Sequence, residues 1–244
     1  MRLIPESEFR SYIPSAVSIS PCRVFPLSVA EGIQGGSIFT DDSGNCGLIR
    51  HNSGFSYLWG SPDEVFLREV YGLVLGGAKL ICGDERICGL FSRWGRVVLV
   101  PRNIYSYPSD TAMQAELPAG FVARKIDTDL FRRLAGRVTP VMYWDSSEQF
   151  SLGGAGICIM HGDEPTAWAF TSAVSSEEAD IGIETAEGYR RRGLALAAAS
   201  LTIAEVLPRR RPTWSCQQSN EGSNRTAERL GFVRVGECLM IRKA

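Results

Sequence analysis

The feature that most constrains the fold is a strand, a glycine-containing turn and a long helix between Asp180 and Leu207. The short run Asp180 to Glu184 places isoleucine at every second position, which is typical of a half-buried strand. The run Leu194 to Leu207 is rich in alanine and leucine, which favour helix, and it stops before Pro208, which cannot continue one. A strand that leads directly into a helix of this length predicts an α/β layer architecture.

The other periodic segments of the chain fall into two regions. In the first region we expect strands at 37–39, 47–49, 55–59 and 97–100 and a helix that begins at Asp63. In the second we expect strands at 121–126, 156–160, 167–174 and 213–217, helices at 130–134 and 223–230, and a final strand pair around Gly236. The segment 105–118 is broken by Pro108 and Pro118 and is expected to connect the regions. The predicted domains are residues 1–117 and 118–244.

Composition excludes several classes of protein. Of the 244 residues, 44% are hydrophobic and 22% charged, and the formal net charge is -1, which is typical of a soluble globular protein and not of a nucleic-acid binder. No apolar run approaches the roughly 18 residues that span a bilayer. Pro5, Glu6 and Glu8 interrupt the apolar core that a signal peptide requires. We therefore expect a cytoplasmic protein with neither nucleic-acid nor membrane partners.

Cysteine and histidine usage limits the chemistry. The seven cysteines include no C-x-x-C pair and are scattered, which favours reduced core thiols over a disulfide framework. The two histidines, His51 and His161, lie beside turn-forming residues and are expected in surface loops. A metal site built from several imidazoles is impossible with only two, and we expect no metal.

The turn before the long helix has the features of an anion site. Arg190, Arg191 and Arg192 supply positive charge, Gly193 lets the backbone approach a ligand closely, and Ala195 is small. The N-terminus of a helix has N–H groups without intrahelical partners and the positive end of the macrodipole. The turn matches neither the P-loop nor the dinucleotide-binding pattern. Taken alone, such a turn is more often a helix end with surface arginines than a phosphate site.

Two longer motifs resemble those of the GCN5-related N-acetyltransferase (GNAT) superfamily. The segment R-R-R-G-L-A, from Arg190 to Ala195, is similar to that family's [QR]-x-x-G-x-[GA] coenzyme A signature. The segment N-E-G-S-N-R-T-A-E-R-L-G-F, from Asn220 to Phe232, is similar to its downstream helix. The stretches I-G-I-E-T and P-T-W-S-C resemble those of a bacterial subgroup with an additional N-terminal region, here a possible degenerate half of the same fold.

The resemblance implies a GNAT-like mixed sheet with splayed central parallel strands, flanked by helices and preceded by an N-terminal α/β region. It also implies acetyl-CoA as co-substrate and transfer of its acetyl group to a primary amine by direct attack. The cofactor-binding residues it implies are Ile183, Arg190, Arg191, Arg192, Gly193, Leu194, Ala195, Asn220 and Ser223. A backbone N–H near Ile183 is expected to stabilise the oxyanion.

Proton transfer defines the candidate catalytic residues. The attacking amine must lose a proton, and Glu184 and Asp180 are carboxylates on the expected cofactor-facing strand. For Asp180, a solvated strand start is the main alternative. Many family members carry a tyrosine acid four residues before the final G-F pair, where this chain has Ala227. Ser223, or water, is then the candidate that protonates the departing thiolate.

Two questions stay open at the level of sequence. The chain could be a non-catalytic acyl-CoA-binding sensor or interaction module instead of an enzyme. The acceptor could be a small-molecule amine or a protein amine, and the oligomeric state is unknown. The segment 138–154 is expected to form the acceptor site, with an aromatic and acidic set suited to a cationic amine: Tyr143, Trp144, Asp145, Glu148 and Phe150.

Overall fold

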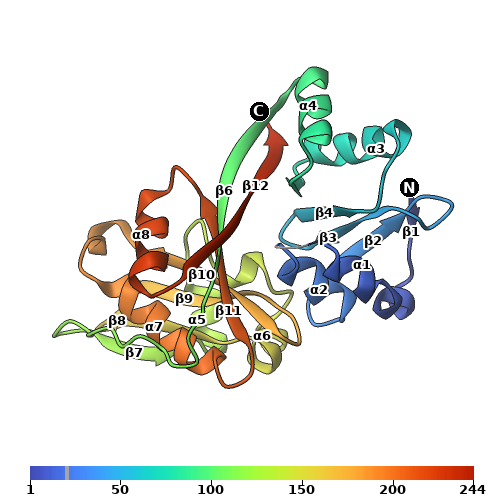
Figure 1. Cartoon of the computed structure of the whole chain (residues 1–244). Helices are drawn as coiled ribbons and strands as arrows, with labels where there is room; N and C mark the ends of the chain where they lie inside the picture. The colour runs from blue at the N-terminus through green and yellow to red at the C-terminus, as the bar shows by residue number, and fades with distance from the viewer. Residues whose placement is uncertain (20–21) are drawn as a thin grey trace. The chain divides into compact units, whose positions relative to one another are not determined.

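The computed structural model describes residues 1–19 and 22–244, which form two compact units. One unit contains residues 1–104, 216–219 and 235–244, and the other contains residues 105–215 and 220–234. Two long strands, β6 (Val97–Ser106) and β12 (Val233–Lys243), contribute residues to both units (Figure 1). The functional division expected between residues 117 and 118 stays a prediction.

The first unit is a mixed sheet with helices. Its strands follow the order β1-β2-β3-β4-β5-β12, in which β4 and β5 are parallel and the other registered neighbours antiparallel. The strands are β1 (Arg2–Leu3), β2 (Gly36–Thr40), β3 (Gly47–His51), β4 (Phe55–Trp59) and β5 (Lys79–Cys82). The helices are η1 (Glu6–Tyr12), α1 (Ile13–Val17), α2 (Val24–Ala30), α3 (Glu64–Leu75) and α4 (Glu85–Trp94).

The second unit repeats this arrangement of strands. Its order is β7-β8-β9-β10-β11 and then β6, in which β10 and β11 are parallel and the strands from β7 to β10 antiparallel. The strands are β7 (Val122–Lys125), β8 (Gly156–His161), β9 (Glu164–Val174), β10 (Glu178–Thr185) and β11 (Arg211–Gln217). The helices are α5 (Thr128–Arg133), η2 (Pro140–Met142), α6 (Ser147–Gly153), η3 (Glu187–Tyr189), α7 (Leu194–Val206) and α8 (Glu221–Arg229).

Helix α7 forms the core of the second unit with the sheet. It contacts β8, β9 and β10, and Ala197, Ala198 and Ala199 are fully buried. The small alanines let the helix approach closely, and the Thr202 hydroxyl donates to the Ala169 carbonyl at 3.1 Å. Phe170, on β9 of the same sheet, also has no exposed surface and packs against Tyr143 at 5.7 Å. Burying a side chain of that size contributes about 1.5 to 3 kcal/mol. This packing fixes the start of α7, and hence the arginine-rich turn, against the sheet.

The predicted α/β class and mixed sheet are confirmed, and two local expectations are wrong. Residues 232–242 do not form a strand pair, because Gly236 lies within the single strand β12. His51 is not a surface-loop residue but is fully buried at the end of β3. Its ring lies edge-on to Phe25 at 5.2 Å, and the Ser53 N–H donates to its Nδ1 at 3.0 Å. A local hydrogen bond and an aromatic neighbour thus offset the cost of burying a polar ring.

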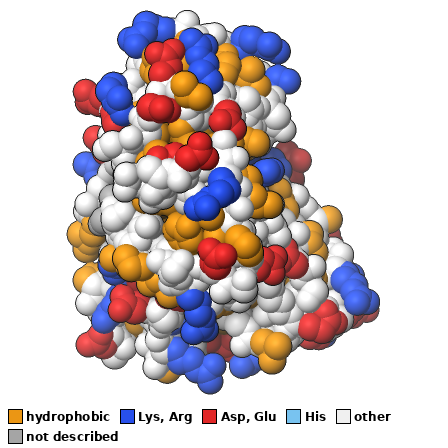
Figure 2. Space-filling model, turned by 90° about the vertical axis from the view of Figure 1, so that its right-hand side faces the viewer, with side chains coloured by type: hydrophobic (Ala, Val, Ile, Leu, Met, Phe, Trp, Pro, Cys, Tyr) orange, Lys and Arg blue, Asp and Glu red, His pale blue; other side chains and the backbone are white. Residues whose placement is uncertain are grey.

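Charge is mixed over the surface. On the face drawn in Figure 2, basic and acidic side chains are interspersed with hydrophobic ones. This agrees with a net charge near zero. Among the described residues, every helix is too short or too polar to cross a bilayer.

Candidate active site

The central parallel strands of the second unit part from one another. Registered pairing joins Glu178 to Arg211, Ala179 to Pro212 and Asp180 to Thr213, and no further pair joins the two strands in the described part of the chain. Yet β10 continues to Thr185 and β11 to Gln217. The C-terminal halves of the two strands are therefore splayed, because the registered pairing that joins their first residues ends at Asp180 and Thr213.

The N–H of Ile183 faces this splay. The Ala186 N–H donates to the Thr166 carbonyl at 2.8 Å, in continuation of the β9–β10 ladder. N–H groups of successive residues in a strand point to opposite edges. The N–H groups of 182 and 184 therefore point toward β9, and that of Ile183 points toward β11. A donor in this position is what an expected oxyanion site requires.

The turn before α7 is open and positively charged. Gly193 is the N-cap residue, with a φ of 81°, and no side chain caps the helix. A Cβ placed on Gly193 would meet no heavy atom within 4 Å. The Ala197 N–H donates to the carbonyl of the N-cap residue Gly193 at 3.1 Å. The N–H groups of residues 194–196 precede this bond and therefore have no partner within the helix. Donors, charge and open space thus occur together at one helix N-terminus.

The arginines of this turn differ in how they are held. The Arg192 guanidinium donates to the Gly188 carbonyl at 3.3 Å and lies over the Tyr189 ring at 5.2 Å. Arg190 donates to the Thr185 carbonyl at 3.5 Å. Arg191 is exposed, has a φ of 61°, and has no recorded side-chain partner in the described chain. Arg191 is therefore the arginine of the three with the fewest competing contacts for an anion.

Tyr189 was not expected at the site from sequence. Its hydroxyl donates to Glu164 Oε2 at 2.7 Å, which ties η3 to the start of β9. This hydrogen bond, together with burial and the Glu164 charge, raises the pKa of Tyr189 above its usual value. Tyr189 therefore holds the arginine-rich turn as a neutral donor.

The start of α8 lies beside β11. Asn220 caps this helix, since its Oδ1 accepts from the Ser223 N–H at 3.2 Å. The Ser223 hydroxyl accepts a hydrogen bond from the buried Trp214 indole at 3.1 Å. Both expected residues thus lie at the N-terminus of one helix, and Ser223 is connected to the splayed half of β11. Position 227 is occupied by a fully buried alanine, so no side-chain acid is available there.

The two expected carboxylates occupy different surroundings on β10. Asp180 is 8% exposed and accepts from the Ser172 hydroxyl at 2.7 Å. Glu184 is half-buried, and its Oε2 accepts from the Val138 N–H at 2.5 Å. No bond to Oε1 of Glu184 is recorded among the described residues. Of the two carboxylates, Glu184 therefore has the more accessible oxygen for a proton.

The expected acceptor set is only partly available to a ligand. Trp144 and Phe150 are 3% and 2% exposed and pack edge-on at 5.5 Å, so both belong to the core. Tyr143 is half-buried against Phe170 at 5.7 Å. Asp145 and Glu148 are exposed, and the pKa of Glu148 is lowered by hydrogen bonds from its own N–H, Ser146 and Ser147. The aromatic part of that expectation is wrong for Trp144 and Phe150, because Phe150 is a buried residue of α6 and the Trp144 indole donates to the Thr171 carbonyl of the sheet at 2.7 Å.

The corresponding turn in the first unit has a different character. It joins β4 to α3, as the arginine-rich turn joins β10 to α7. Its helix is capped by Asp63, whose carboxylate accepts from the Phe66 N–H at 2.8 Å. A Cβ on Gly60 would lie 2.2 Å from the Asn45 carbonyl oxygen, so this turn is packed against its neighbours. A carboxylate at this helix N-terminus opposes a second anion.

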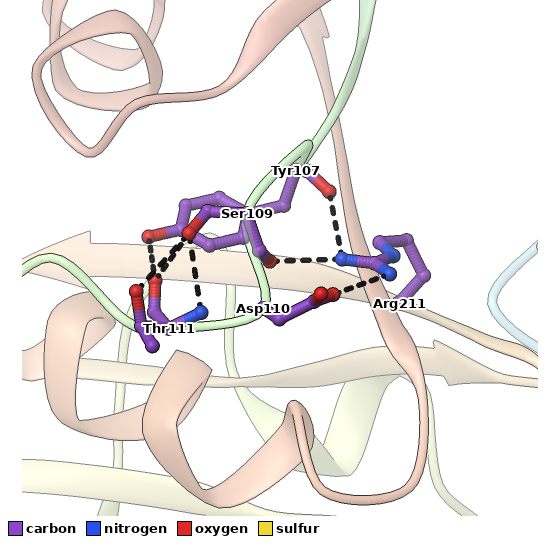
Figure 3. A network of polar contacts seen from close by, with 5 residues as sticks. All are labelled: Tyr107, Ser109, Asp110, Thr111 and Arg211. Carbon is purple, nitrogen blue, oxygen red and sulfur yellow. Dashed lines mark hydrogen bonds and ion pairs between the residues drawn. The ribbon is translucent and has the colours of Figure 1, made fainter.

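Arginines after α7 serve the structure instead of a ligand. Arg210 donates to the Ser175 carbonyl at 2.7 Å. Arg211 donates to the carbonyl of Ser109 at 2.8 Å and pairs with Asp110 at 2.9 Å (Figure 3). These contacts fix the expected connector, 105–118, to β11 of the second unit. A cavity of about 620 Å³ lies between segment 110–115 and the C-terminal half of α7, and none of the expected site residues lines it.

Comparison with known proteins agrees with this geometry. The family model described as GNAT acetyltransferase matches residues 21–239. The uncharacterized N-acetyltransferase YdfB of Bacillus subtilis (strain 168) is 26% identical over 234 residues, which cover 88% of each chain. A GCN5-related N-acetyltransferase-like protein from Streptococcus suis superposes with a TM-score of 0.79 at 22% identity, covering 98% of this chain and 100% of the other.

A tandem GNAT protein from the clavulanic acid biosynthesis pathway superposes with a TM-score of 0.62 at 9% identity, over 99% of this chain and 97% of the other. At such low identity these structures show the shared fold. The family match extends over most of the sequence, including both signature segments and both splayed strands. The chain therefore belongs to the GNAT acetyltransferase family and is an acyltransferase.

Proposed function

We propose that the second unit binds acetyl-CoA and transfers its acetyl group to a primary amine. The observation that carries this proposal is the splay of β10 and β11 beside the open, uncapped turn at Gly193. A thioester arm fits between the two strands beyond Asp180 and Thr213, where their registered pairing ends. A pyrophosphate fits the N–H groups and arginines at the start of α7.

The N–H groups of Arg191 through Ala195 hold the pyrophosphate, and the Arg190, Arg191 and Arg192 side chains add positive charge. Leu194 is 1% exposed and anchors the first turn of α7 in the core. Asn220 and Ser223 contact the pantetheine arm from the start of α8. Each of these roles combines a position in the structure with a residue of the family signature.

The reaction proceeds by direct attack. The amine nitrogen bonds to the thioester carbonyl carbon while the Ile183 N–H stabilises the negative oxygen. The amine proton passes to Oε1 of Glu184, directly or through a water, and the carbon–sulfur bond breaks. The coenzyme A thiolate receives a proton from Ser223 or water. Asp180, which is buried and bonded to Ser172, is the second candidate for the proton acceptor.

We further propose that the first unit is a degenerate half of the same fold without a cofactor site. It has the same strand order, but Asp63 occupies the helix N-terminus where a phosphate would bind. The chain then binds one acetyl-CoA.

The test is release of coenzyme A thiol with acetyl-CoA and an amine panel of spermidine, kanamycin and a lysine peptide. Wild type is expected to turn over at least one amine. Glu184→Gln should keep acetyl-CoA affinity and lose about 10²- to 10⁴-fold in kcat, the usual contribution of a general base. Glu187→Gln, which changes an exposed carboxylate in η3, is the matched control. Binding of acetyl-CoA without turnover of any amine would favour the alternative, a non-catalytic acyl-CoA-binding module.

A further inference from the structure

Two side chains from neighbouring strands hold the backbone of one residue, Val138, between them. Glu184 on β10 and Trp168 on β9 are direct partners in the antiparallel register. Oε2 of Glu184 accepts from the Val138 N–H at 2.5 Å, and the Trp168 indole donates to the Val138 carbonyl at 2.7 Å. Both polar groups of Val138 are thus satisfied by side chains of the sheet, 46 and 30 residues away in sequence.

Two glycines make this approach possible. A Cβ on Gly136 would lie 2.8 Å from both Cδ and Oε2 of Glu184, closer than real Cβ contacts. A Cβ on Gly182 would lie 3.3 Å from Cγ1 of Val138 and 3.1 Å from Cζ of Phe170. The segment 135–139, which joins α5 to η2, therefore lies directly on β10 at Gly182 and Glu184.

These contact points lie on either side of Ile183 in sequence, and the Ile183 N–H faces the splay. The segment 135–139 thus lies against the two residues that flank Ile183, whose N–H donates to the acetyl carbonyl under the proposed function. We infer that Trp168 is a positioning residue of the proposed reaction: together with Glu184 it clamps segment 135–139, the wall beside the acceptor amine, against β10. The role of this segment in acceptor binding rests on the proposed function. The two hydrogen bonds of the clamp do not depend on that function.

The clamp gives the two residues separate tasks. Trp168 is a positioning residue, because its indole contacts the segment and not the reacting atoms. Glu184 uses Oε2 to hold the segment, which orients its carboxylate and leaves Oε1 for the amine proton. Loss of the Trp168 bond should therefore change acceptor binding more than the chemical step.

The test compares Trp168→Phe with Trp144→Phe. Each variant keeps an aromatic ring and loses one indole N–H to carbonyl bond of 2.7 Å, but the Trp144 bond goes to Thr171 on β9 and not to Val138. Gly136→Ala is a second, independent variant that displaces the Glu184 carboxylate. For each protein, hydrogen exchange of residues 135–139 is measured with and without acetyl-CoA. The KM and kcat for the best amine of the panel and the Kd for acetyl-CoA are measured in parallel.

We expect exchange at Val138 to rise by about tenfold in Trp168→Phe, as the loss of one hydrogen bond allows, and to stay unchanged in Trp144→Phe. The amine KM should rise by a similar factor in Trp168→Phe and Gly136→Ala, while the acetyl-CoA Kd stays constant. Unchanged hydrogen exchange at Val138 in both Trp168→Phe and Gly136→Ala would overturn the clamp. Faster exchange with an unchanged KM would overturn the acceptor wall. A wild type that turns over no amine would overturn the proposed function and the acceptor role together, while the exchange data still decide the clamp.

Discussion

At the scale of single residues, the N-cap positions of two corresponding helices show how one side chain decides what a turn can bind. Gly193 leaves the start of α7 uncapped, and Asp63 fills the start of α3 with its carboxylate. The R-x-x-G-x-A motif made the open turn at the start of α7 predictable, because such a turn depends on the local backbone. The clamp on Val138 was not predictable, because it depends on the register of β9 and β10, which brings Trp168 opposite Glu184.

The thiols also differ residue by residue. Burial raises the pKa of Cys158 to about 12, so this thiol stays protonated at pH 8. A hydrogen bond from Cys22, whose sulfur lies 3.7 Å away, lowers the pKa of Cys238. Because the thiolate is the nucleophile, we predict that iodoacetamide at pH 8 modifies Cys238 well before Cys158. Peptide mass spectrometry measures both rates, and protein unfolded in urea is the control. Equal rates in the native protein would contradict the assigned environments.

At the scale of elements, strong local signals were reliable and weak ones were not. Helix α7 was predicted with nearly correct ends, because alanine and leucine favour helix and Pro208 stops it. Helix α4 was missed, although Asp84 caps it, because Gly89 and several polar residues obscure its apolar face. The division of β12 at Gly236 was wrong, because this glycine lies within a strand that continues from Val233 to Lys243.

Helix α8 offers a test in which a structural role and a binding role can be separated. Asn220→Ala removes the cap and should lower the free energy of unfolding by about 1 kcal/mol. It should also weaken acetyl-CoA binding. Asn220→Asp keeps an oxygen that accepts from the Ser223 N–H, so stability should be near wild type while the lost amide donor still weakens binding. Urea unfolding and calorimetric titration measure the two effects.

Asp63→Ala is the control for α8, since it removes a side-chain cap of the same kind from a different helix, α3. A similar loss of stability with unchanged acetyl-CoA affinity is expected. If Asp63→Ala weakened binding as much as Asn220→Ala, the effect at α8 would be one of general stability alone.

At the scale of the whole molecule, the described chain contains the same strand order twice, and of the two corresponding turns the one at Gly193 is open while the one at Gly60 is closely packed. The sequence indicated a second region but no repeat, because strand order is set by long-range pairing and leaves little trace in local patterns. Residues 235–244, at the end of the sequence, belong to the first unit through β12 and β5. The last strand is therefore part of the fold of the first unit.

Calorimetric titration with acetyl-CoA, of wild type and of Gly193→Glu, tests the central claim most directly. Wild type should bind one acetyl-CoA per chain. The variant should lose binding, because its side chain enters the open space above the turn and brings a negative charge to the helix N-terminus. Its circular dichroism spectrum should match that of wild type. Its free energy of unfolding should fall by about 1 to 2 kcal/mol, because a non-glycine residue then adopts a positive φ. Undiminished binding by a folded Gly193→Glu protein, or two sites per chain, would contradict the account.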